Sequence, residues 1–337
     1  MTEILSNISE SEKVRSKDKQ FSTKDNVIRF ALLIFAVLIA TVFALIEPAF
    51  LKSGNLLNIL GSTVVLCIAS IGVSMVMITG EIDFACGSEL ASAACIVAVL
   101  SAKHVNYALC VIVALAFCTV VGVINGLLHT RIGIPGFIAT MGVSFILDGF
   151  NKLITNTGSV HSSTWTSFYT FFGQARVFGV IPVSVLILIA VVIIMLIYTE
   201  GMTNGRKLYA VGSNSNACKY IGIDDKKEKM KSFIISAFLC GIAGVINTSQ
   251  INTANPFMGE TTLVNVLTML MLGATFYRIG VFNVPGTIVG ALLINIINNG
   301  MVMVGAKPWQ QYAVQGLIMI TAVTLITLIR RRAARKG

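Results

Sequence analysis

The sequence has little charge for its length and few of the residues that a catalytic or metal centre uses. Of its 337 residues, 12% are charged and three are histidines, whereas about 25% are charged in an ordinary soluble domain. No GxxxxGK[ST], HExxH, GxSxG or CxxC pattern is present, so nucleotide hydrolysis and protease chemistry on this chain are not expected. The seven cysteines lack metal-ligand spacing. We expect them to be small buried apolar side chains, and we expect no metal site and no enzyme activity.

Apolar runs fill most of the chain, and 55% of its residues are hydrophobic. Runs of about 17 to 20 such residues are long enough to cross a bilayer core. We therefore predict an all-α, polytopic membrane protein of about ten transmembrane helices, with a membrane domain at 28–329 and polar tails at 1–27 and 330–337. Breaks at proline, glycine and charged residues place the candidate spans at 28–46, 58–79, 88–101, 107–128, 135–154, 180–198, 231–250, 261–277, 284–304 and 312–329.

The basic residues indicate the orientation of these spans. If the N-terminus is cytoplasmic, twenty of the 25 Lys and Arg residues lie on the inside and five on the outside. An excess of Lys and Arg marks cytoplasmic loops, so we expect both termini in the cytoplasm and no nucleic-acid partner. The first span has no small-residue cleavage pattern, which is typical of an uncleaved signal anchor. The longest inner loop is at 199–230.

A polar segment interrupts the second and third spans. Between 79 and 89 it holds two glycines and the three acids Glu81, Asp83 and Glu89. Acids at membrane depth are costly and usually face a cavity or a partner. One interpretation is a cytoplasmic turn with solvated acids. The other is a broken helix whose backbone lines a pathway, with Glu81, Asp83 and Ser88 as the candidate pathway residues.

The inner loop contains signals for a short helix. Asn214 suits an N-cap and Gly222 suits the C′ position, which predicts a helix at about 215–221, parallel to the membrane. A helix of this length is not stable alone. With Tyr220 and Ile221 as anchors, it indicates a docking element for another protein. The alternative is a surface helix that packs on its own bundle.

Three amides fall on one face of the ninth span, because Asn295, Asn298 and Asn299 are spaced i, i+3 and i+4. They indicate either interhelical hydrogen bonds or a hydrated pore wall, and the sequence does not decide between them. Asp148 in the fifth span is also open to two interpretations, since Lys152 at i+4 could neutralise it.

Four stretches in this order resemble the permease subunits of ATP-binding-cassette importers of the ribose and simple-sugar type. Gly80 to Ser88 is similar to the family's Gly-Gly-Ile-Asp-Leu-Ser-Val-Gly-Ser. The other three are Asn125 to Leu128 with Ile134 to Gly142, then Gly205 to Ile223, and then Asn299-Gly300 with the last span. Each is weakly specific alone, but together they cover nearly the whole chain.

The resemblance implies several partners in the plasma membrane: a second copy or a related permease, two cytoplasmic ATPase subunits and an extracytoplasmic solute-binding protein. ATP and magnesium would then bind to the ATPase, with no cofactor on this chain, and a sugar-like solute would cross the bilayer. The family's coupling helix falls on about 214–222. The residues that we assign to coupling are Arg206, Gly212, Asn214, Ala217, Tyr220, Ile221 and Gly222.

The chain also departs from the family pattern. Glu81 replaces a glycine, Cys86 replaces a valine, and Glu89 adds an acid. These acids would suit a cationic solute, or they would pair with Arg278 if both lie at the same boundary.

The main hypothesis is the membrane subunit of an ATP-driven importer for a pentose or hexose. One alternative is the same machine for a nucleoside, a polyol or a furanosyl signalling molecule. Another is an ion-coupled secondary transporter that uses Glu81, Asp83 or Asp148. A membrane scaffold or receptor explains neither the broken span nor the amide face.

Overall fold

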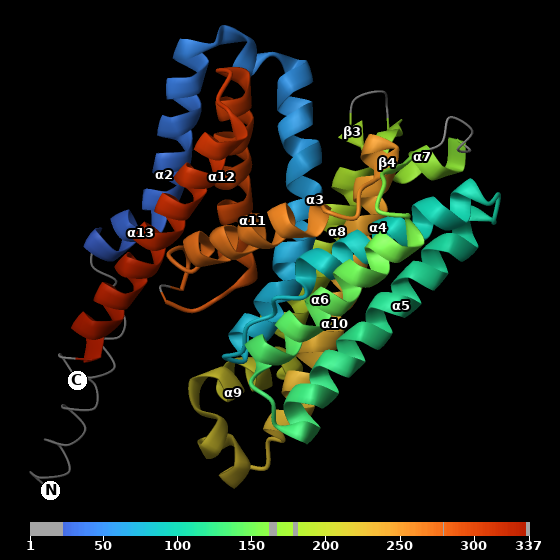
Figure 1. Ribbon diagram of the computed structural model, residues 1–337. Helices are drawn as coiled ribbons and strands as arrows, with labels where there is room; N and C mark the ends of the chain where they lie inside the picture. The colour runs from blue at the N-terminus through green and yellow to red at the C-terminus, as the bar shows by residue number, and fades with distance from the viewer. Residues whose placement is uncertain (1–22, 162–166, 178–180, 279, 335–337) are drawn as a thin grey trace, which may run out of the picture.

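The computed structural model describes residues 23–161, 167–177, 181–278 and 280–334, and these are almost entirely helical (Figure 1). The helices are α2 (Thr23–Ile46), α3 (Ser53–Ile78), α4 (Cys86–Ala102), α5 (Tyr107–Leu127), α6 (Gly136–Ile154), α7 (Ser167–Gln174), α8 (Val183–Leu196), α9 (Thr203–Tyr220), α10 (Asp225–Ile251), α11 (Met258–Gly273), α12 (Val284–Met303) and α13 (Pro308–Ala334). Short helical turns follow α2, α5 and α8, namely η1 (Pro48–Leu51), η2 (Leu128–Ile132) and η3 (Ile197–Gly201).

Each predicted span coincides with one helix. The predicted break between the spans 58–79 and 88–101 is also present, because residues 79–85 separate α3 from α4. Within the described residues, six helical segments are long and apolar enough to cross a membrane. They begin with α3, α5, α6, α8, α10 and α12. The chain is thus an all-α polytopic protein, while the count of ten crossings stays a prediction. The predicted tails differ in extent, because α2 begins at Thr23 and α13 continues to Ala334.

Two sets of four helices repeat one arrangement in opposite directions. The first set consists of α3, a non-helical stretch, and then α4, α5 and α6. The second set has the same order, with α10, a non-helical stretch, and then α11, α12 and α13. The helix α10 packs against α4 and α5, as α3 packs against α11 and α12. Gly61 of α3 lies beside Gln250 of α10, and Gly72 lies beside Ser236, so the two long helices are antiparallel. This is the inverted repeat that many transporter folds contain.

Small residues bring the central helices into close contact. A Cβ at Gly72 would lie 3.0 Å from the backbone oxygen of Ser236. A Cβ at Gly87, near the start of α4, would overlap the carbonyl of Gly259 near the start of α11. The two interrupted spans therefore touch backbone to backbone at this crossing. All seven cysteines are buried and free, as the sequence predicts.

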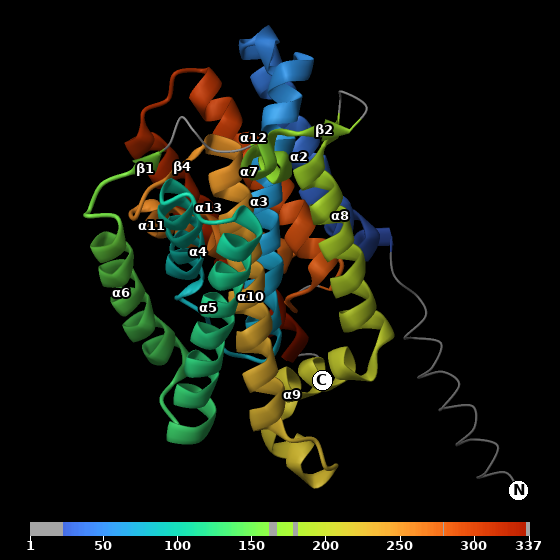
Figure 2. The ribbon, with the colours of Figure 1, turned by 90° about the vertical axis from the view of Figure 1, so that its right-hand side faces the viewer.

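The bundle has two different ends (Figures 1 and 2). One end carries α7 and two short antiparallel ladders, in which β1 (Val160–His161) pairs with β4 (Thr253–Ala254) and β2 (Arg176–Val177) pairs with β3 (Ile181–Pro182). The predicted spans leave residues 155–179 without a span, and the structure places β1, α7 and β2 there. The other end carries α9, and α13 finishes towards this end.

Candidate functional site

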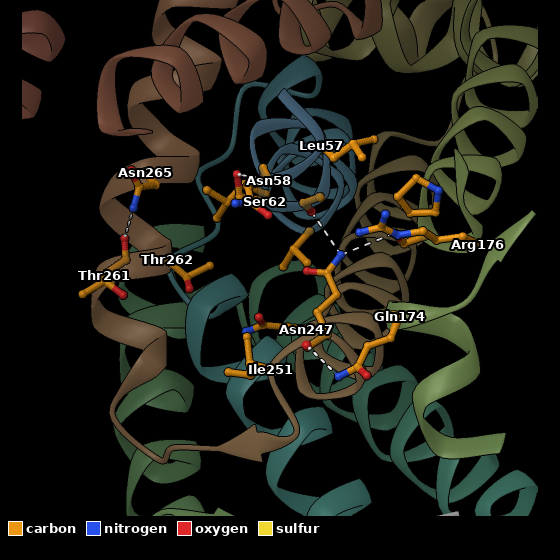
Figure 3. A pocket seen from close by; sticks show the side chains of 17 residues that line it. Leu57, Asn58, Ser62, Gln174, Arg176, Asn247, Ile251, Thr261, Thr262 and Asn265 are labelled. Carbon is orange, nitrogen blue, oxygen red and sulfur yellow. Dashed lines mark hydrogen bonds between the residues drawn. The ribbon is translucent and has the colours of Figure 1, made fainter. Parts of the chain in front are cut away.

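A polar cavity of about 740 Å³ lies at the α7 end of the bundle (Figure 3). Its wall is built from α3, α10 and α11, and α7 and the β2–β3 hairpin complete it. This volume is typical of small-molecule sites. The polar side chains that line it are Asn58, Ser62, Gln174, Arg176, Ser184, Asn247, Gln250, Thr261, Thr262 and Asn265. We refer to it below as the polar cavity.

On each helix, the spacing of these polar residues places them on the face towards the cavity. Asn58 and Ser62 are four residues apart on α3, and Thr261 and Asn265 are four apart on α11. Residues at i and i+4 share a helix face. On α10, Asn247 and Gln250 are three apart, so they also face the cavity.

The amide of Gln250 ties the cavity wall together. Its Nε2 donates to the carbonyl oxygen of Gly61 on α3 at 3.1 Å and to Ser184 Oγ at the start of α8 at 3.4 Å. Its own backbone oxygen accepts from Gln174 Nε2 of α7 at 3.1 Å. One residue of α10 thus connects three other elements around the cavity.

The chemistry of the lining is mostly neutral and hydrogen-bonding. Of the lining residues, Arg176 is the one with a charged side chain, and no carboxylate is present. Amides offer both donors and acceptors, and hydroxyls offer both as well. Such a wall suits a neutral solute with many hydroxyl groups. The acids that the sequence singled out lie elsewhere.

A second cavity, of about 520 Å³, opens at the α9 end. It is lined by the end of α3 and the following turn, by α9, and by the turn before α12. Glu81, Tyr209, Gly212 and Ser213 contribute to its wall. We refer to it as the α9 cavity.

A buried and mainly apolar layer separates the two cavities. On α3, the polar cavity reaches Leu66 and the α9 cavity begins at Met77, and residues 67–76 between them are buried. On α11, Val266, Met269 and Leu270 fill the same layer and are at most 1% exposed. Along α3 and α11, buried side chains therefore separate the two cavities in this conformation.

Glu81 forms an ionic cluster at the α9 end. Its Oε1 accepts from Lys229 Nζ at 2.7 Å and lies 3.1 Å from His129 Nε2. Burial on its own would raise the pKa of the Glu81 carboxyl, but the hydrogen bonds and charges of His129 and Lys229 lower it to about 2. The carboxylate that replaces the family's glycine is therefore neutralised from α10 and η2.

Asp83 and Ser88 have structural partners of their own. Asp83 is buried, and its two oxygens accept from Ser236 Oγ at 2.7 Å and from the backbone N–H of Ala85 at 2.9 Å. Ser88 Oγ donates to Asp148 Oδ1 at 2.6 Å, in a smaller cavity of about 290 Å³ between α4, α6 and α11. Lys152, which the sequence suggested as a partner of Asp148, places its Nζ 5.0 Å from the centre of the Phe257 ring.

Two of the three asparagines of α12 make interhelical hydrogen bonds. Asn299 exchanges two amide bonds of 2.9 Å with Asn55 of α3. Asn298 donates to Asn265 Oδ1 of α11 at 3.0 Å and accepts from Gln315 of α13 at 2.9 Å. Asn295 donates within its own helix, to the oxygen of Ala291. The six candidate pathway residues are thus spread over the fold rather than gathered in one site, and their role in a pathway stays a prediction.

The expected short helix is the second part of α9. The backbone leaves helical geometry at Asn214, whose Oδ1 caps the N–H of Ala217 at 3.0 Å. Gly222 has φ +76, and the N–H groups of Gly222 and Ile223 bond back to Lys219 and Cys218, which is a Schellman ending. The sequence missed the preceding helical part from Thr203. Tyr220 and Ile221 are 92% and 70% exposed at its tip.

The other residues assigned to coupling lie along the same helix. Arg206 is exposed, and a Cβ at Gly212 would overlap the carbonyl of Ile78 at the end of α3. This glycine therefore allows α9 to lie directly against the first interrupted span.

Sequence reasoning missed most of the polar cavity. The signal was present as polar pairs at helical spacing near the ends of three spans, such as Asn58 with Ser62. Recognising them as one site requires knowing that α3, α10 and α11 are neighbours.

Comparisons with known proteins are consistent with this architecture. Residues 55–323 match the family model described as "Branched-chain amino acid transport system / permease component". The chain is 30% identical over 295 residues to the ribose import permease protein of Escherichia coli strain K12, covering 87% of this chain and 91% of the relative. It is 28% identical over 331 residues to the galactose/methyl galactoside import permease protein of Haemophilus influenzae, covering 93% and 97%. No solved structure matches.

The chain therefore belongs to this family of transport-system permease components, and it is a multi-pass protein of the plasma membrane. A further relative, the D-allose transport system permease protein of Escherichia coli, is 30% identical over 299 residues, which are 88% of this chain and 91% of the relative. The family description names amino acids and these relatives name sugars. Family membership alone thus leaves the solute open.

Proposed function

We propose that this chain is the transmembrane permease subunit of an ATP-binding-cassette importer for a monosaccharide. The observation that carries the proposal is the neutral, hydroxyl- and amide-lined cavity at one end of an inverted-repeat bundle. Three relatives are named for the import of ribose, allose and galactose. A pentose or hexose offers hydroxyl groups that match this lining.

The two cavities support an alternating-access path. The polar cavity would receive the solute at the outer face, and the α9 cavity would release it into the cytoplasm. In the structure the buried layer between them is closed. Rocking of the two inverted repeats against each other would open this layer, as it does in secondary transporters built from inverted repeats. The path would form together with a second permease, either a copy of this chain or a related one.

Energy would come from partner subunits. We place α9 and both termini in the cytoplasm, because most Lys and Arg residues then lie inside. The exposed Tyr220 and Ile221 would dock one of two ATPase subunits, which bind ATP and magnesium. A solute-binding protein would deliver the sugar at the α7 end. The described residues contain no group of three or more metal-ligating His, Cys, Asp or Glu side chains.

Ion-coupled secondary transport is the weaker alternative. It would need an acid that is free to bind and release a cation. Glu81 is ion-paired with Lys229, whereas Asp83 and Asp148 accept hydrogen bonds from the neutral hydroxyls of Ser236 and Ser88. Of the three, Glu81 is thus the acid that is already neutralised by a cation. A cationic solute is disfavoured as well, because Arg176 is the charged residue in the wall of the polar cavity.

Uptake in proteoliposomes tests the proposal. The permease would be reconstituted with its cognate ATPase and solute-binding subunits and offered labelled ribose, allose and galactose, with and without internal ATP. We expect uptake of at least one sugar that requires both ATP and the binding protein. Uptake that persists without ATP and follows an imposed proton or sodium gradient would refute the importer.

A further inference from the structure

Arg278, in the turn between α11 and α12, forms a clamp across three parts of the chain. Its Nη2 donates to Glu200 Oε2 at 2.6 Å. Its guanidinium carbon lies 5.1 Å from the ring centre of Tyr209 and 5.6 Å from that of Tyr277. Arg is suited to this combination, since its planar fork bonds a carboxylate while its face stacks on aromatic rings.

The clamp joins the second repeat to both sides of the junction between η3 and α9. Glu200 lies in η3, directly before α9, and Tyr209 lies on α9 itself. Arg278 belongs to the turn that follows α11. A displacement of α9 therefore acts on the second repeat through these contacts, in addition to the covalent chain.

The backbone beside the clamp is held in an unusual conformation. Tyr277 has φ +61, in the left-handed region that bulky residues rarely occupy. Such conformations persist where the surroundings fix them, and they often mark functional positions. Here the Tyr277 ring rests against Arg278, and the N–H of Gly280 bonds to the oxygen of Ala274 at 2.8 Å.

The clamp is poorly placed to serve stability alone. The side chains of Arg278 and Glu200 are 42% and 31% exposed, and exposed ion pairs add little to folding stability. The first repeat has a corresponding connection, because Glu81 in its turn pairs with Lys229 at the beginning of α10, just beyond α9. The two turns thus form ion pairs with the segments on either side of α9, Arg278 with η3 before it and Glu81 with α10 after it.

We propose that Arg278 is a positioning residue that transmits the movement of α9 to the second repeat. This inference rests on the proposed docking of an ATPase at α9. Loss of the clamp leaves the ATPase bound and active but reduces the solute moved for each ATP hydrolysed. In this proposal the clamp acts between elements of this chain and is not part of the docking surface for the ATPase.

The test measures sugar uptake, ATP hydrolysis and ATPase co-purification on the same reconstituted complex, with labelled ribose, allose and galactose as probes. The variants are Arg278→Ala, Glu200→Ala, and the exchange E200R/R278E. Arg131→Ala is the matched control, since Arg131 is an exposed arginine in η2. Arg278→Lys keeps the charge and removes the fork and the ring stacking, so it tests the clamp even if the alanine variant does not fold.

We expect uptake per ATP to fall roughly 2- to 30-fold in R278A and E200A, the range seen for residues that carry coupling between sites. The charge exchange restores part of it, and R131A resembles the wild type. An unchanged ratio in R278K and E200A overturns the proposal, as does loss of ATPase co-purification, which would make Arg278 a docking residue. A wild-type complex without ATP-driven uptake refutes the proposed function itself and the clamp with it.

Discussion

Asn55 on α3 and Asn299 on α12 hold each other by two reciprocal amide hydrogen bonds, each 2.9 Å long. The two residues are 244 positions apart in the chain. The pair links the first helix of the first repeat to the third helix of the second. In an apolar setting, an amide without a partner is costly, so this pair fixes how the two repeats meet.

Replacing Asn299 by Leu removes both bonds. We expect the free energy of unfolding to fall by about 1 kcal/mol, since interhelical hydrogen bonds in membrane proteins average about 0.6 kcal/mol each. Asn295→Leu is the matched control, because the Asn295 amide donates only within α12, to Ala291. Unfolding in mixed micelles, followed by circular dichroism, measures both variants. An equal loss of unfolding free energy in the two variants would show that the Asn55–Asn299 pair adds no stability of its own.

The Glu81 cluster predicts a pH dependence of stability. The pKa of Glu81 is about 2 in the folded chain against an ordinary 4.5. Because the folded value is the lower one, the contribution is fully present above about pH 4.5 and is lost as the pH falls towards 2. Glu81→Gln should flatten this part of the stability curve.

Thermal melts between pH 3 and 7 check this expectation, with Glu260→Gln, an exposed carboxylate of α11, as the control. A wild-type Tm that falls towards pH 3 no faster than that of E81Q contradicts the role of the cluster.

Substitutions at the tip of α9 should weaken ATPase binding without changing the stability of the fold. Tyr220→Asp with Ile221→Asp places two charges on side chains that are 92% and 70% exposed. Because neither side chain packs into the bundle, we expect an unchanged Tm and at least a tenfold loss of ATPase affinity, about 1.4 kcal/mol. Affinity purification of the complex measures it. Asn216→Asp, at an exposed position of the same helix, should retain the ATPase, and equal loss there would point to a general charge effect.

Filling the polar cavity should block transport without unfolding the chain. Ser62 lines this cavity, and its hydroxyl bonds only to backbone oxygens of its own helix, those of Asn58 and Ile59. Ser62→Phe therefore adds volume and costs no interhelical bond. We expect uptake to fall about tenfold or more, as for other displaced binding geometries, and Ser62→Ala to transport normally.

Leu60→Phe controls for bulk, since Leu60 is an exposed residue of α3 outside the cavity wall. Uptake by S62F at the wild-type rate would exclude the polar cavity from the solute path.

The sequence predicted much of the fold because membrane helices are marked locally. The length of the apolar runs, and the proline, glycine and charged residues that interrupt them, predicted ten spans, and each of these coincides with a helix. Capping chemistry also placed Asn214 and Gly222 correctly, because both signals lie within one turn of the helix that they end. These features depend on near neighbours in the chain.

The site was harder to predict because its residues are brought together only by packing. Glu81 reads as a pathway acid in isolation, and its pairing with Lys229, which is 148 residues away, has no local signature. Pairing with Arg278 was one of two interpretations of the acids of the first broken span, and Arg278 pairs with Glu200 instead. The Asn face of α12 was readable as a face, but its partners on α3, α11 and α13 were not.

The helix α8 determines the relative orientation of the two repeats, because it makes the number of membrane crossings between them odd. Among the described residues between α6 and α10, the segment that begins with α8 is the one long and apolar enough to cross a membrane, and α9 lies at the end of the bundle where α8 finishes. With an even number of crossings between the repeats, both would point the same way, and Arg278 would emerge on the face opposite to Glu200. An evolutionary gain or loss of one helix at this position would therefore convert an antiparallel duplication into a parallel one.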